Sequence, residues 1–117
     1  MPQSERRGAP RIVTRLPLTL TQAARQLVTW TENLSVSGAY CVVKRFLPPM
    51  TKLQIRLELP DRLGSRAISC EGVVVRAQPP APSPRQSAYH VAVFFSGISD
   101  RSRALLAEYV QRHPRRP

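Results

Sequence analysis

Residues 53–59, with the sequence LQIRLEL, alternate between apolar and polar side chains without a break. The apolar side chains of this segment are Leu53, Ile55, Leu57 and Leu59. Such alternation is typical of a β-strand with one face buried and the other in water. Pro60, Asp61 and Gly64 follow directly and favour a turn, so the segment predicts a half-buried strand that ends at a tight connection.

Five further segments have strand character, and turn-forming residues separate them. They are residues 16–20, 26–32, 39–43, 66–76 and 88–95. Pro17 suits the start or the edge of a strand, and Gly72 is a candidate for a β-bulge. Residues 78–87 contain four prolines, which predicts a long hairpin connection between the last two strands.

The period of the pattern changes near the end of the chain. Ser99 is a suitable helix cap, and Asp100 suits the positive end of a helix dipole. An apolar stripe with helical spacing follows, formed by Leu105, Leu106, Tyr109 and Val110. The helix is expected to end at or just before Pro114. Six strands followed by one helix predict a mainly β fold, a six-stranded antiparallel β-barrel with a C-terminal α-helix covering an apolar patch.

Length and composition indicate one domain with basic ends. The 117 residues suffice for one modest core, which we place in residues 12–113. Residues 1–11 form an Arg-rich arm that is expected to be flexible, and residues 114–117 form a basic tail. The chain shows no signal peptide and no apolar run near the ~20 residues of a membrane helix, so we expect a cytoplasmic protein.

The charge balance indicates an anionic partner, such as nucleic acid, a nucleotide or an acidic lipid. Eighteen Lys and Arg residues oppose seven Asp and Glu residues, which gives a formal net charge of +11. Sixteen of these basic residues are Arg, and the chain also has twelve Pro, so a coding bias explains part of the excess. The position of an arginine therefore matters more than the number of arginines.

Few residues offer catalytic or metal-binding chemistry. Cys41 and Cys70 lie far apart in apolar segments, which favours buried free thiols. His90 and His113 have no neighbours at metal-ligand spacing, so no metal site is expected. No nucleophile elbow is present, and we expect neither an enzyme nor a cofactor. Trp30 is expected to pack in the barrel rather than to serve as a stacking platform.

Two polar clusters do stand out, and together they indicate a family. Arg7 and Arg11 form an RxxxR pattern just before the first strand, and Asn33, Ser35 and Gly38 form an [DN]xSxxG pattern between two strands. In a small barrel with a terminal helix, this pair of motifs resembles the PilZ domain, the bacterial receptor module for cyclic di-GMP. The resemblance implies that the arginine arm lies across the ligand and that the second motif forms the floor of the site.

The chemistry of these residues suits that ligand. A guanidinium group pairs with phosphate oxygens or with guanine O6 and N7, and it stacks on purines. Asn33 is expected to form an Asx turn or to accept hydrogen bonds from guanine, Ser35 to offer a hydroxyl, and Gly38 to allow positive φ and close approach to the ligand. The resemblance further implies that Arg6, just before the motif, supports binding of an intercalated nucleotide dimer.

The predicted function is that of a stand-alone cyclic di-GMP receptor whose arm becomes ordered on binding and changes a surface for an unidentified protein. Two alternatives stay open at this point. One is a PilZ-like adaptor that binds no ligand, although all five motif residues are present. The other is a basic barrel that binds RNA or single-stranded DNA, for which the chain offers few aromatic platforms.

Overall fold

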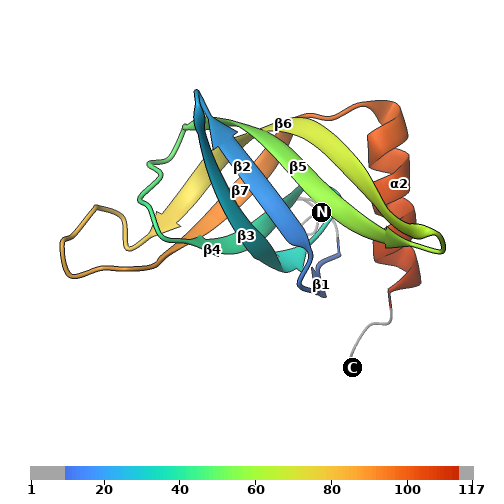
Figure 1. Cartoon of the computed structure of the whole chain (residues 1–117), viewed down its shortest axis with the longest axis horizontal. Coiled ribbons are helices and arrows are strands. Elements are labelled where there is room, and N and C mark those ends of the chain that lie inside the picture. Colours follow the sequence, from blue (N-terminus) through green and yellow to red (C-terminus); the bar gives the residue numbers. More distant parts are fainter. Residues whose placement is uncertain (1–9, 114–117) are drawn as a thin grey trace, which may run out of the picture.

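The computed structural model describes residues 10–113, and these form a β-barrel with one helix (Figure 1). The strands are β1 (Ile12–Val13), β2 (Pro17–Gln22), β3 (Arg25–Leu34), β4 (Gly38–Val43), β5 (Lys52–Asp61), β6 (Gly64–Gln78) and β7 (Tyr89–Gly97). The helix is α2 (Asp100–Arg112). The predicted mainly β fold with a C-terminal helix is confirmed.

Six of the strands close into an antiparallel barrel. The sheet order is β1-β3-β2-β5-β6-β7-β4, and the additional pairing of β3 with β4 joins the two ends. β3 makes this closure possible because its first six residues pair with β2 and its last residues pair with β4. The two-residue strand β1 is an addition to the predicted six, and it pairs with the end of β3 through Ile12 opposite Leu34.

The segment 53–59 behaves as its pattern predicts. It lies within β5, and its four apolar side chains are all at most 4% exposed. β5 pairs along its whole length with β6, and the connection at residues 62–63 is a tight turn. The bulge predicted at Gly72 is confirmed by a register shift between Glu71 and Gly72. The proline-rich connection also lies where it was predicted, as the long loop between β6 and β7 (Figure 1).

The prediction for Trp30 is wrong. β3 places Leu27, Thr29 and Thr31 toward the barrel interior, so that Trp30 projects outward with 49% of its surface exposed. The guanidinium of Arg15 lies 5.7 Å from the centre of the Trp30 ring, a cation–π distance. The polar Thr31 is tolerated inside because its hydroxyl donates to the Thr14 carbonyl and accepts from the Leu16 amide.

Helix α2 begins and packs as its sequence predicts. The Ser99 hydroxyl accepts a hydrogen bond from the Ser102 amide at 3.1 Å, which is an N-cap interaction. Leu106 and Val110 are buried against the barrel. Tyr109 also reaches the strands, because its hydroxyl lies 3.1 Å from Oγ1 of Thr14. The helix ends at Arg112, two residues before Pro114, which lies outside the described residues.

Both cysteines are free and buried, as predicted. Burial raises the pKa of the Cys41 thiol to about 12, with a further contribution from Glu32. Burial likewise raises the pKa of Cys70 to about 11, with Glu71 adding to the effect. Both thiols are therefore protonated and unreactive at neutral pH. Among residues 10–113, no helix is long and apolar enough to cross a membrane.

Candidate functional site

Four residues on neighbouring strands form a row across the outer surface of the barrel. Asn33 on β3 pairs with Tyr40 on β4, Tyr40 pairs with Ala92 on β7, and Ala92 pairs with Arg76 on β6. Neighbouring strands lie about 4.8 Å apart, so the row spans about 14 Å from Asn33 to Arg76. The small Ala92 side chain near the middle of this row leaves room above the sheet.

The row is the floor of a groove of about 580 Å³, which we call the cross-strand groove. It is lined by Arg11, Asn33, Tyr40, Val75, Arg76 and Ala92. A positive guanidinium therefore lies at each end, with an aromatic ring and apolar atoms between them. This arrangement suits a flat, anionic ligand that is longer than a single base.

Two β-bulges direct side chains into the cross-strand groove. The register of β3 against β4 shifts between Thr31 and Asn33, next to one end of the row. The register of β6 against β7 shifts between Val74 and Arg76, at the other end. The shift in β6 leaves both Val75 and Arg76 exposed on the outer face. Bulges often occur beside binding sites because they redirect side chains in this way.

The two sequence motifs meet at one end of the groove. Nη1 of Arg11 donates a hydrogen bond of 2.7 Å to Oδ1 of Asn33. The contact forms because β1 pairs with the end of β3, with Val13 opposite Asn33, and because Arg11 lies on the same face as Val13. Residues 22 positions apart are thus joined, and Arg11 and Asn33, one from each motif, lie in contact. Asn33 lies at the end of β3 and not in the following turn.

Ser35 supports the turn after β3. It is 1% exposed, and its hydroxyl accepts from the Ser37 amide at 3.1 Å and lies 3.0 Å from the Ser37 hydroxyl. The backbone amide of Ser35 donates to the carbonyl of Gly38 at 2.9 Å, which closes the turn. In this structure the Ser35 side chain therefore shapes the loop that precedes Tyr40, and its contact with a ligand stays a prediction.

The positive φ expected at Gly38 is not observed, and its close approach to a ligand stays a prediction. Gly64 is the only described glycine with a positive φ, so Gly38 does not use the left-handed region. Instead, a Cβ atom at Gly38 would clash with the carbonyl oxygen of Val93. The glycine lets β4 approach β7 closely, and it thereby sets the position of Tyr40 two residues later.

Sequence reasoning missed four residues of the groove. Tyr40, Val75, Arg76 and Ala92 belong to no linear motif, and they come together only through the strand register. The predicted residues Arg6 and Arg7 lie outside the described residues, as does most of the arm. Across residues 10–113, no group of three or more His, Cys, Asp or Glu side chains could hold a metal ion.

Comparison with known proteins identifies the family of this chain. The family model described as PilZ domain matches residues 5–112. No curated protein sequence matches the chain. This chain therefore belongs to the PilZ domain family. Domains of this family are cyclic di-GMP receptor domains, and in general they bind a ligand or act as adaptors rather than as enzymes.

Solved structures share the fold. The inhibitor of motility MotI/DgrA of Bacillus subtilis superposes with a TM-score of 0.75 at 23% identity, over 92% of this chain and 50% of that chain. The PilZ domain of YcgR from Escherichia coli, determined with c-di-GMP, gives a TM-score of 0.60 at 14% identity, over 91% and 90% of the two chains. The PilZ domain of CeSA from a cellulose-synthesizing bacterium gives a TM-score of 0.50 at 15% identity, over 87% of this chain and 94% of that chain. This chain thus spans half the length of MotI/DgrA.

Proposed function

We propose that this chain is a receptor for cyclic di-GMP and that the cross-strand groove is its binding site. The observation that carries the proposal is the 2.7 Å contact between Arg11 and Asn33. It joins the described arginine of the RxxxR motif to the first residue of the second motif, at the edge of a groove with a further arginine at its far end. Family membership supports the same ligand.

The Arg11–Asn33 contact is suited to exchange for a ligand. Asn33 is uncharged, so Arg11 leaves it without the cost of breaking an ion pair. Arg11 then binds a phosphate oxygen or a guanine edge in a bidentate manner. The freed amide oxygen of Asn33 accepts hydrogen bonds from guanine N1 and N2. Arg76 supplies the second guanidinium for the other half of the ligand, about 14 Å away.

The arginine arm completes the proposed site. Arg7 adds a second guanidinium from the arm, and binding orders the part of the arm that precedes Arg11 against the barrel. Arg6 stacks on the second molecule of an intercalated nucleotide dimer. Ordering of the arm changes a surface that an unidentified protein recognises, in the cytoplasm of a bacterium. The conformational entropy that the arm loses lowers the net affinity for the ligand. In return, binding shifts the arm from one conformational state to another.

Isothermal titration calorimetry with cyclic di-GMP tests the proposal, with GTP and cyclic GMP as control ligands. We expect selective binding, and a roughly ten- to hundredfold loss of affinity in Arg11→Ala, because a charge-assisted contact contributes about 1.5–3 kcal/mol. Arg76→Ala should weaken binding in the same direction. Arg25→Ala is the matched control, since Arg25 lies at the β2–β3 hairpin and does not line the groove.

The same titration separates the alternatives. Two nucleotides per chain, falling to one in Arg6→Ala, supports the intercalated dimer. A folded sample that releases no heat with cyclic di-GMP would leave the adaptor as the better description. Binding of a polyuridine oligonucleotide that excess cyclic di-GMP does not displace would favour the nucleic-acid alternative. Wild-type affinity in both Arg7→Ala and Arg11→Ala would show that the site is assigned wrongly.

A further inference from the structure

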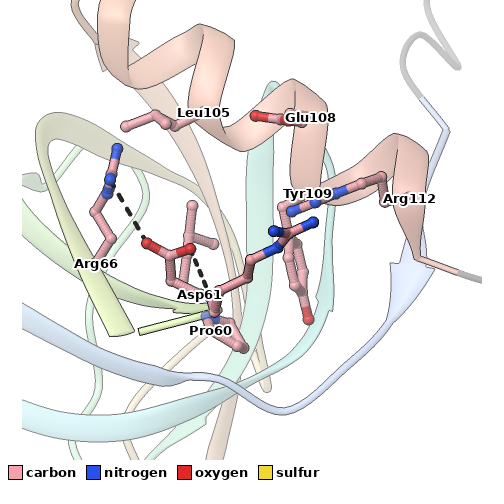
Figure 2. A pocket seen from close by; sticks show the side chains of 9 residues that line it. Pro60, Asp61, Arg66, Leu105, Glu108, Tyr109 and Arg112 are labelled. Carbon is pink, nitrogen blue, oxygen red and sulfur yellow. Dashed lines mark hydrogen bonds and ion pairs between the residues drawn. The ribbon is translucent and has the colours of Figure 1, made fainter. Parts of the chain in front are cut away.

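A second hollow lies on another part of the surface, between helix α2 and the hairpin that connects β5 and β6. Its volume is about 310 Å³, and we call it the helix–hairpin hollow. Figure 2 shows Leu105, Tyr109 and Arg112 of the helix facing Pro60 and Asp61 of the hairpin. It shares no lining residue with the cross-strand groove.

The charge of the helix–hairpin hollow is not balanced. Three arginines line it, Arg62, Arg66 and Arg112. Asp61 is occupied already, since its Oδ2 lies 3.5 Å from Nη2 of Arg66 and its Oδ1 accepts from the Arg62 amide. Within residues 10–113, neither of the two ion pairs formed by Lys or Arg involves the side chain of Arg62 or Arg112. Glu108 also lines the hollow, but neither ion pair includes it, so two exposed guanidinium groups border one small space without a carboxylate bound to either.

Apolar surface adjoins these cations. Leu105 and the ring of Tyr109 form one wall of the hollow, and Pro60 forms part of the opposite wall. Leu63, at the tip of the hairpin next to Arg62, has 95% of its surface exposed. A binding partner would thus meet two positive groups beside an apolar contact.

We propose that the helix–hairpin hollow docks a short acidic segment of a partner protein, with carboxylates on Arg62 and Arg112 and an apolar side chain against Leu105 or Leu63. Charge complementarity selects a carboxylate-bearing peptide. A nucleic-acid strand fits less well, because the one aromatic side chain lining the hollow, Tyr109, already packs edge-on against His113 at 5.6 Å.

Fluorescence anisotropy with a labelled synthetic peptide of Glu, Asp and Leu tests the proposal on the full chain. We expect saturable binding that falls about tenfold in the double variant Arg62→Gln/Arg112→Gln. The matched control is Arg101→Gln/Arg103→Gln, which removes two arginines from the same helix region outside the hollow. Control binding should stay within about twofold of wild type. Circular dichroism melting curves verify that both variants fold.

Three outcomes would overturn the proposal. The first is no saturable binding of the peptide, and the second is an equal loss in both double variants, which indicates general attraction to a basic protein. The third is that the hollow variant loses binding to polyuridine or to phosphatidylglycerol vesicles but keeps binding to the peptide. Amide chemical shifts supply an independent test, because the peptide should perturb residues 59–66 and 105–112 and leave residues 22–25, at the β2–β3 hairpin, unchanged.

Discussion

At Gly38 the chain has no room for a side chain. A Cβ atom would meet a backbone carbonyl of β7, and a backbone neighbour gives way less easily than the end of a flexible side chain. Gly97 provides the contrast, because a Cβ there would meet the carboxylate of Glu71 at 3.0 Å, and that side chain can rotate aside. We therefore expect the same substitution to lower the free energy of unfolding by different amounts at the two glycines.

Gly38→Ala should lower the free energy of unfolding by about 2–3 kcal/mol, because β4 and β7 must separate to admit the methyl group. Gly97→Ala should lower the free energy of unfolding by less than about 1 kcal/mol. Urea unfolding followed by circular dichroism measures both values. An unchanged midpoint for Gly38→Ala would contradict the close approach of the two strands.

At the scale of single residues, the sequence predicted part of the candidate site. Arg11 and Asn33 were recognised from their motifs, and the structure joins them. Tyr40, Arg76 and Ala92 could not be recognised, because their proximity depends on the register of three strand pairs and on the bulges near both ends of the row. The spacing of residues along the sequence carries no information about the strand register or the bulges.

At the scale of elements, alternation predicted the position of β5 but gave the wrong orientation for Trp30 in β3. β5 has apolar residues on one face only, so its orientation is unambiguous. β3 places Thr29 and Thr31 inside, whereas Val28 and Trp30 point outward. A burial rule based on hydrophobicity fails there because hydrogen bonds to Thr14 and Leu16 satisfy the buried hydroxyl of Thr31.

Ser99→Ala should destabilise the protein by about 1 kcal/mol, because it removes the side chain that satisfies the Ser102 amide at the start of α2. Ser87→Ala is the matched control, since Ser87 is exposed in the connection between β6 and β7. Thermal unfolding of the two variants makes the comparison. A loss of stability of the same size in Ser87→Ala would show that the helix cap formed by Ser99 has no particular role.

At the scale of the whole molecule, the closed six-stranded barrel and the position of the helix could be predicted, whereas the strand pairing that closes the barrel could not. Closure requires β3 to change partner from β2 to β4 along its ten residues. The same arrangement brings β1 and Thr14 beside the helix, where the Thr14 and Tyr109 hydroxyls lie 3.1 Å apart. One short segment thus contacts Asn33 through Arg11 and α2 through Thr14.

Tyr109→Phe should weaken cyclic di-GMP binding roughly threefold, although Tyr109 does not line the cross-strand groove. The reason is that β1 pairs through only two residues, so the contact with Thr14 helps to hold Arg11 in place before the ligand arrives. Thr14→Val should have the same effect, and the double variant should be no worse than either single one. Additive losses, measured by calorimetry, would contradict a shared contact.

The hydroxyl pair of Thr14 and Tyr109 has a consequence for signalling if both proposed ligands bind. Tyr109 lines the helix–hairpin hollow, so an acidic partner and the nucleotide act on the two ends of one contact. Any factor by which the nucleotide strengthens partner binding must equal the factor by which the partner strengthens nucleotide binding. The domain would then work as a coincidence detector, and the abundance of its partner would set the messenger concentration at which it responds.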